Sequence, residues 1–168
     1  VCLAVSLLSL NAIVQAAESR DDAVVVTATR IATRVNETTS DITLVDREQI
    51  ERGGPTLREV MRMVPGVELS QSGGEGSVMG LLLRGTNSDH VLVLVDGVRL
   101  GSATAGTTAF ENLPLGQIDR IEVLRGPASS LYGSSAIGGV VQIFTRSGRG
   151  DPGVNFNAGY GSYDTYRL

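Results

Sequence analysis

Residues suited to enzymatic chemistry are few in this sequence. His90 is the only histidine, and it lies just before an apolar stretch, where histidine usually has a capping or loop role. A hydrolase needs a nucleophile beside such a base, but Gly133-Ser134-Ser135-Ala136 lacks the spacing of a G-x-S-x-G elbow. The chain has no lysine, which excludes a Schiff base, a P-loop lysine and a Ser-x-x-Lys nucleophile. A carboxylate pair for glycoside chemistry stays open, yet nothing singles one out, so we predict a protein that is not an enzyme.

Metal and nucleotide sites have no stronger support. No H-x-x-x-H or C-x-x-C pattern occurs, and the acidic residues lack the spacing of a calcium loop. The Gly-rich stretch at 71–80 contains Gly74-x-Gly76-x-x-x-Gly80, which is one residue too long for a dinucleotide fingerprint and precedes a strand pattern instead of a helix. The arginines are spread along the chain without a basic patch for nucleic acid. We therefore predict no cofactor, no metal and no nucleic acid.

The first apolar run resembles an export signal. Residues 1–17 are almost wholly apolar or small, and the run is shorter than the about 20 residues of a membrane-spanning helix. Val14-Gln15-Ala16 supplies small residues where a signal peptidase reads, so we predict a signal peptide at 1–16 whose start is missing. A buried helix or a membrane anchor are the alternatives. Cys2, the only cysteine, lies in this run, so cleavage would leave no disulfide.

A β-prone stretch follows, with three valines and two threonines between Asp22 and Arg30. A polar segment comes after it, so the backbone of the stretch would be accessible for pairing with another chain's sheet edge. The alternative is an ordinary first strand of the domain's own sheet. The residues alone favour the ordinary strand.

The next segments predict a sheet with short helices. Asp46 and Gln49 have capping-box spacing, as do Thr56 and Glu59, and Gly53-Gly54 and Pro65-Gly66 would end the two helices. One helix face repeats apolar residues, and the methionines are expected to fill the core. Strands are predicted at 41–45, 81–83, 91–95, 98–100, 121–125 and 140–145, those at 81–83 and 91–95 buried on both faces, with a tight turn at Asp96-Gly97. The period-2 alternation from Val154 to Tyr160 suits a transmembrane β-strand or a half-buried edge strand.

Seven blocks in fixed order resemble the plug domain of TonB-dependent outer-membrane receptors, and among these the cobalamin transporters are most similar. The resemblance covers about residue 22 to the end of the chain. The blocks are Asp22-Ala23-Val24-Val25-Val26-Thr27-Ala28, Val64-Pro65-Gly66-Val67, Leu83-Arg84-Gly85-Thr86, Val93-Leu94-Val95-Asp96-Gly97-Val98, Ile121-Glu122-Val123-Leu124-Arg125-Gly126-Pro127, Leu131-Tyr132-Gly133 and Ala136-Ile137-Gly138-Gly139-Val140-Val141.

The resemblance implies a partner and reverses the preference for an ordinary first strand. The β-prone stretch matches the Ton box, which the energy transducer TonB, working with ExbB and ExbD, captures by strand addition. Arg84 and Arg125 resemble plug arginines that pair with barrel glutamates, and Glu122 is expected to join them; in an isolated plug the arginines would be solvated. The expected Ton box residues are Asp22, Ala23, Val24, Val25, Val26, Thr27, Ala28 and Thr29.

The resemblance also implies a substrate and a location. Outward loops of the cobalamin receptors touch the ligand, and Asn87 fits this role because its amide can hydrogen-bond a corrin amide. The loop at 101–110 is one residue shorter than in those receptors, and the other positions differ in residue type. A siderophore receptor and a freestanding periplasmic binding or signalling module are the alternatives. The expected substrate contacts are Val78, Gly80, Asn87, Ala105, Gly106 and Thr107.

We therefore expect an α+β fold, a small mixed sheet with short helices and long loops, followed by the first strand of a transmembrane barrel. The predicted divisions are a signal at 1–16, a Ton box at 22–29, a plug at 36–150 and the start of a barrel at 151–168. The expected location is the outer membrane, with the plug inside the barrel and the Ton box in the periplasm.

Overall fold

The computed structural model describes residues 23–71, 73, 77–101, 113–148, 159–161 and 165–167. The predicted signal, the Ton box residue Asp22 and the predicted substrate contacts Ala105, Gly106 and Thr107 lie outside this part of the chain, as does most of the predicted start of a barrel. No helix among the described residues combines the length and the apolar composition needed to cross a membrane.

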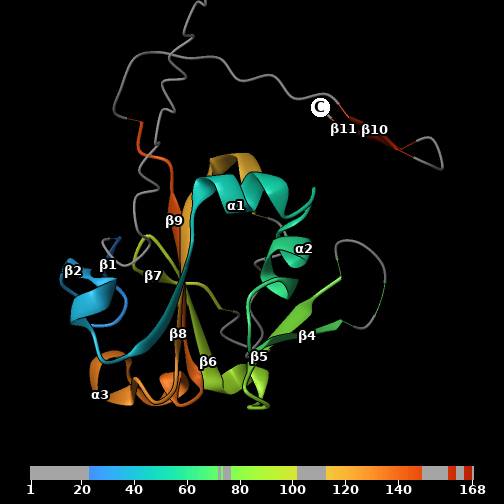
Figure 1. Cartoon of the computed structure of the whole chain (residues 1–168). Helices are drawn as coiled ribbons and strands as arrows, with labels where there is room; N and C mark the ends of the chain where they lie inside the picture. The colour runs from blue at the N-terminus through green and yellow to red at the C-terminus, as the bar shows by residue number, and fades with distance from the viewer. Residues whose placement is uncertain are drawn as a thin grey trace, which may run out of the picture.

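A five-stranded mixed sheet forms the centre of the fold (Figure 1). Only β6 and β9 pair in parallel; the other neighbours are antiparallel. The predicted strands at 41–45 and 91–95 are confirmed with their bounds, and those at 121–125 and 140–145 are confirmed within longer strands. The order across the sheet is β3 (Asp41–Val45), β8 (Ile118–Arg125), β9 (Gly139–Thr145), β6 (Val91–Val95) and β7 (Val98–Arg99).

Two helices cover one face of the sheet, α1 (Arg47–Arg52) and α2 (Leu57–Arg62). Both begin with the predicted capping box, in which the cap side chain accepts from the third backbone N–H and the third side chain accepts from the cap N–H. The apolar residues predicted for this face are buried, namely Leu57, Val60 and Met61 on α2 and Val64 just after its C-cap. Pro65-Gly66 does not itself end α2, because the helix already stops at Arg62 with Met63 as its C-cap.

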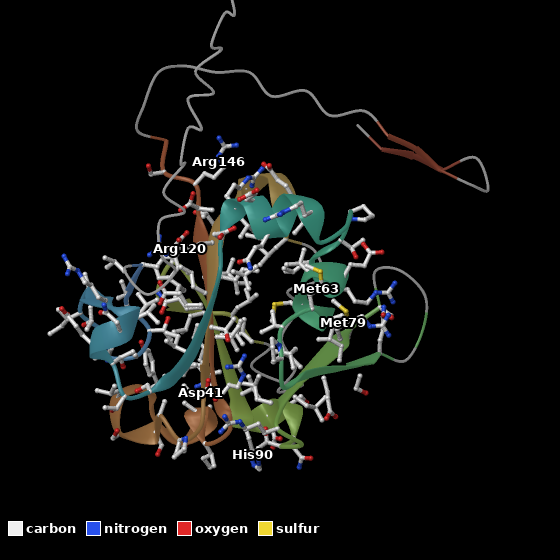
Figure 2. The ribbon with its side chains drawn as sticks, viewed as in Figure 1. Asp41, Met63, Met79, His90, Arg120 and Arg146 are labelled. Atoms are coloured by element: carbon white, nitrogen blue, oxygen red, sulfur yellow. The ribbon has the colours of Figure 1, made fainter. Side chains whose placement is uncertain are left out.

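Methionine packing differs from the prediction at one position. Met61 and Met79 are buried in the core, whereas Met63 is 54% exposed because it stands past the end of α2. Figure 2 shows Met63 and Met79 beside α2. The prediction that the methionines fill the core is therefore wrong for Met63.

A separate hairpin corrects the predicted Gly-rich loop. β4 (Val67–Gln71) pairs antiparallel with β5 (Met79–Leu83), so Gln71 and Gly80 belong to strands and not to the loop. The sequence of β4 alternates with a period of two, which is typical of a strand. The strands predicted from the sequence nevertheless did not include residues 67–71. β5 is buried on one face only, because Leu82 stays partly exposed, and the expectation of burial on both faces is wrong there.

The two faces of the sheet carry separate apolar clusters. The larger cluster lies under α1, α2 and the β4–β5 hairpin, which Figure 1 shows on one side of the sheet. The smaller cluster lies on the opposite face, with β1 (Val24–Val25), β2 (Thr33–Arg34) and the short helix α3 (Ser129–Tyr132) nearby. Near the end of the chain, β10 (Gly159–Gly161) pairs antiparallel with β11 (Thr165–Arg167).

Candidate functional site

Residues 23–30, which we call the docked segment, lie against the smaller apolar cluster. Only Val24 and Val25 form a strand, paired with Arg34 and Thr33. After Val25 the chain turns, because the Arg30 N–H donates to the Val26 carbonyl at 2.8 Å. The alternative of an ordinary first strand therefore holds only for Val24 and Val25. The expected accessibility of this stretch is found only in part, since Val25, Thr27 and Ala28 are buried whereas Val24 and Thr29 are exposed.

A buried carboxylate holds the docked segment in place. Oε2 of Glu122 accepts hydrogen bonds from the Val26 and Thr27 N–H groups, both at 2.8 Å, and from the Thr27 hydroxyl at 2.7 Å. Oε1 accepts from Arg120 Nε at 3.1 Å. A buried charge is costly unless it is paired and hydrogen-bonded, and these four donors satisfy that requirement. The side chain of Glu122 is 0% exposed.

Two further side chains complete this contact. The Tyr132 hydroxyl donates to the Thr27 carbonyl at 3.0 Å, and Arg30 lies over the Tyr132 ring with its guanidinium carbon 5.3 Å from the ring centroid. Arg30 Nη1 also donates to the Leu131 carbonyl at 3.1 Å. Burial raises the pKa of the Tyr132 hydroxyl above its ordinary value of 10.0; Arg30 opposes this shift and Glu122 adds to it.

Ionisation of Tyr132 is expected to loosen this contact at high pH. Because its pKa is raised in the folded state, Tyr132 contributes stability that is complete below pH 10.0 and is lost as the pH rises through the folded-state pKa. A phenolate also cannot donate to the Thr27 carbonyl. An ultraviolet absorbance titration should show a late-ionising tyrosine that the Tyr132→Phe variant lacks. Superimposable high-pH limbs for the two proteins, after scaling for tyrosine content, would contradict this assignment.

The two predicted lock arginines share one carboxylate, that of Asp41. Arg125 Nη1 lies 2.8 Å from Asp41 Oδ1, and the Arg84 guanidinium pairs with the other oxygen. Arg125 also donates from Nη2 to the Thr43 hydroxyl at 2.7 Å and from Nε to the Pro65 carbonyl at 2.8 Å. Its side chain is only 6% exposed, so the expectation that Arg125 would be solvated in an isolated plug is wrong. Arg84 is exposed yet paired.

Glu122 does not join these arginines. Side chains alternate between the two faces of a strand, so Glu122 and Arg125, three positions apart on β8, point to opposite faces. Glu122 faces the docked segment, while Arg125 reaches Asp41, Thr43 and Pro65. Figure 2 shows Asp41 near the lower end of the sheet and Arg120, the ion-pair partner of Glu122, near the upper end. The expected common network is therefore wrong.

The structure describes three of the expected substrate contacts. Val78 is 51% exposed just before β5, and Asn87 is exposed at the start of the 3-10 helix Ser88–His90. Gly80 lies on β5 beside that 3-10 helix, because a Cβ added there would lie 3.4 Å from the Ser88 Cβ. Val78 and Asn87 are therefore both accessible to solvent.

His90 and the acidic residues form no metal site in the described part of the chain. No group of three or more His, Cys, Asp or Glu side chains there is placed to hold a metal ion. His90 ends its 3-10 helix, and its carbonyl accepts from the Gly138 N–H at 2.9 Å. This is the loop role that its place in the sequence predicts.

Comparisons with known proteins agree with this architecture. A family model described as the TonB-dependent receptor plug domain matches residues 34–140. The vitamin B12 transporter BtuB of Vibrio cholerae serotype O1 is 44% identical over 148 residues, which cover 88% of this chain and 24% of that protein. The chain thus spans about a quarter of the length of the curated relatives it matches.

Solved structures show the same fold. FpvAI, solved in complex with pyocin S2, superposes with a TM-score of 0.66 at 27% identity, over 85% of this chain and 18% of that one. The ferric yersiniabactin uptake receptor FyuA of Yersinia pestis gives a TM-score of 0.54 at 28% identity, over 66% of this chain and 17% of that one. The matched family is a receptor family, so the interpretation that the chain is not an enzyme is confirmed. The mixed sheet with its short helices, together with these matches, shows that the chain belongs to the plug domains of TonB-dependent receptors.

Proposed function

We propose that this plug gates an outer-membrane receptor for the uptake of cobalamin. The observation that carries the proposal is the 44% identity to a vitamin B12 transporter over 88% of the chain. Asn87 is exposed, and its amide supplies a hydrogen-bonding group for the amides of a corrinoid. No bond chemistry is involved: the plug binds the substrate and blocks the barrel until it is moved.

The energy for moving the plug would come from TonB, with ExbB and ExbD, through the Ton box at residues 22–29. Strand addition requires backbone N–H and C=O groups that pair with a partner strand. The described part of this stretch already forms a strand at Val24 and Val25, so its backbone can adopt the extended form that pairing needs. Substrate promotes release only if the docked and released forms bind it with different affinities.

A siderophore receptor is the second candidate. Its support is structural: the ferric yersiniabactin receptor has the same fold, and the ferric enterobactin receptor PfeA of Pseudomonas aeruginosa is 32% identical with a TM-score of 0.51. Both of those proteins are receptors for ferric chelates. Receptors for both substrate classes share this fold, so the side chains that face the ligand must distinguish cobalamin from a ferric chelate.

A chimeric receptor tests the substrate. The plug of the Vibrio cholerae transporter would be replaced by the matched residues of this chain, and uptake of labelled cyanocobalamin measured in cells that lack their own transporter. We expect uptake that excess unlabelled cobalamin suppresses and ferric enterobactin does not. Asn87→Ala should raise the half-saturating cobalamin concentration about two- to tenfold, the value of one lost hydrogen bond.

Asn36→Ala is the matched control, because Asn36 is exposed in the 3-10 helix Val35–Glu37, outside the expected substrate loops. Uptake by this variant should equal that of the unmodified chimera. A chimera that reaches the outer membrane at normal levels but takes up no cobalamin would overturn the substrate assignment.

A further inference from the structure

The sheet face that carries the docked segment also bears a cavity of about 330 Å³. This volume lies at the lower end of the range for small-molecule sites in proteins. Leu92 and Leu94 of β6 line the cavity and are both buried, so they give it an apolar surface. Neither Asn87 nor Asp41 lines it. The cavity is therefore separate from the described substrate contacts and from the arginine cluster around Asp41.

Gln142 of β9 brings a buried amide to this cavity. The residue is only 6% exposed, and its side chain has one described contact, a 3.3 Å approach of the Thr27 hydroxyl to its Oε1. That hydroxyl also donates to Glu122 at 2.7 Å, so it leaves little for Gln142. In the orientation found, no described residue accepts from the two N–H groups of Gln142 Nε2. Because a buried donor without an acceptor is costly, an acceptor atom inside the cavity would be bound favourably.

Two arginines bring positive charge to the same cavity. Residues directly opposite one another on paired strands share a face of the sheet. Arg99 of β7 is opposite Leu94, and Leu94 is opposite Gln142, so these three side chains form a row across the face. Arg30 lines the cavity as well, from its place over the Tyr132 ring. The cavity thus combines two guanidinium groups and a buried amide with an apolar surface.

The charge of these arginines is not neutralised within the described part of the chain. Neither Arg30 nor Arg99 forms an ion pair there. A guanidinium has five N–H donors, and each of these two uses one in a described bond, to the Leu131 carbonyl or to the Ser135 hydroxyl. The row continues to Glu122 on β8, but its carboxylate already has four donors of its own. The cavity therefore offers donors and positive charge to an anion.

We propose that this cavity binds a small carboxylic acid with an apolar body. A carboxylate matches the planar fork of a guanidinium, and it can also accept from the Gln142 amide. The hydrocarbon part would lie on Leu92 and Leu94, where burial of apolar surface adds affinity. The site goes beyond the proposed function, because it requires neither cobalamin nor TonB.

NMR of the isotope-labelled chain tests the site, with the side-chain NH₂ signals of Gln142 as the readout. Hexanoate, hexanamide and inorganic phosphate would be titrated separately. We expect hexanoate to shift these signals saturably, with a dissociation constant of about 10 mM or lower, as for a ligand of few atoms. Hexanamide lacks the charge and phosphate lacks the apolar part, so each should bind at least about fivefold more weakly.

Arg99→Gln removes one guanidinium and should weaken hexanoate binding about fivefold or more. Arg62→Gln is the matched control, because Arg62 is exposed on α2, against the opposite face of the sheet, and it should leave binding unchanged. Gln142→Leu replaces the amide by an apolar side chain and should weaken binding to a similar extent, followed at the backbone amides of Leu92 and Leu94. This variant gives the answer even if Arg99→Gln fails to fold.

The absence of a saturable hexanoate shift at Gln142 would overturn the site. Equal affinity for hexanamide would overturn the role of the arginines, and equal affinity for phosphate would overturn the role of the apolar surface. Equal weakening by Arg62→Gln and Arg99→Gln would place the effect outside the cavity and would also overturn the site. None of these results depends on cobalamin uptake or on TonB binding, so the site and the proposed function can fail separately.

Discussion

Replacing Val25 with proline is expected to abolish binding of the chain to the periplasmic domain of TonB, with a loss in affinity of at least about a hundredfold. Proline lacks the N–H that a partner strand would bond, and its ring fixes φ; a hundredfold loss corresponds to about 2.7 kcal/mol of binding free energy. The substitution also disrupts the pairing of Val25 with Thr33, which loosens the docked form. Loosening alone would favour capture, so a loss of binding can only come from the pairing itself.

Calorimetry measures this effect, and alanine at the same position is the matched control. Val25→Ala removes the buried side chain but keeps the backbone donor, so TonB should still bind it. Circular dichroism would establish that all three proteins are folded. If Val25→Pro binds as tightly as the unmodified chain, no partner strand bonds the Val25 N–H, which rules out the register that pairs through Val25 and Thr27.

Arg125→Ala is expected to lower the free energy of unfolding by about 3 kcal/mol. The substitution removes a nearly buried guanidinium and leaves the Pro65 carbonyl, the Thr43 hydroxyl and part of the Asp41 carboxylate without their donor. Loss of one partner from a buried charge pair costs about 3–5 kcal/mol, and the lower end applies because Asp41 is 47% exposed. Urea unfolding monitored by circular dichroism would measure the change.

Arg84→Ala is the matched control, because Arg84 pairs with the same Asp41 but is 55% exposed. Its removal should cost at most about 1 kcal/mol, as for other exposed ion pairs. Arg125→Lys keeps the charge but lacks the planar guanidinium that reaches three partners. Its loss of unfolding free energy should therefore lie between those of Arg84→Ala and Arg125→Ala. Equal losses for Arg84→Ala and Arg125→Ala would contradict the internal role assigned to Arg125.

Local signals explain which elements the sequence predicts well. Each capping box depends on residues three positions apart, so Asp46 and Thr56 mark their helices without tertiary information. The apolar face of α2 follows from helical periodicity, and the buried run of β6 from its unbroken apolar sequence. The alternation of residues 67–71 is an equally local indication of a strand. The glycines that follow favoured the prediction of a loop from residue 71 onward.

The site depended on contacts that no local pattern encodes. Glu122 meets Thr27 across 95 positions, and Arg125 meets Asp41 across 84. No local pattern predicts that the Tyr132 hydroxyl donates to the Thr27 carbonyl, although Tyr132 lies in one of the blocks that resemble the family. Glu122 and Arg125 are three positions apart on β8, so the alternation of a strand predicts that their side chains lie on opposite faces of the sheet. The residues that they bind there could not be predicted from the sequence.

The most direct test of the account is NMR of the isotope-labelled chain bound to unlabelled TonB periplasmic domain. We expect residues 23–29 to lose their contacts with Glu122 and Tyr132 and to gain cross-strand contacts with a TonB strand, while β8 and β9 keep their pairing. The opposite result is a bound TonB that contacts other surfaces while the Thr27–Glu122 contact persists. That result would contradict the Ton box assignment.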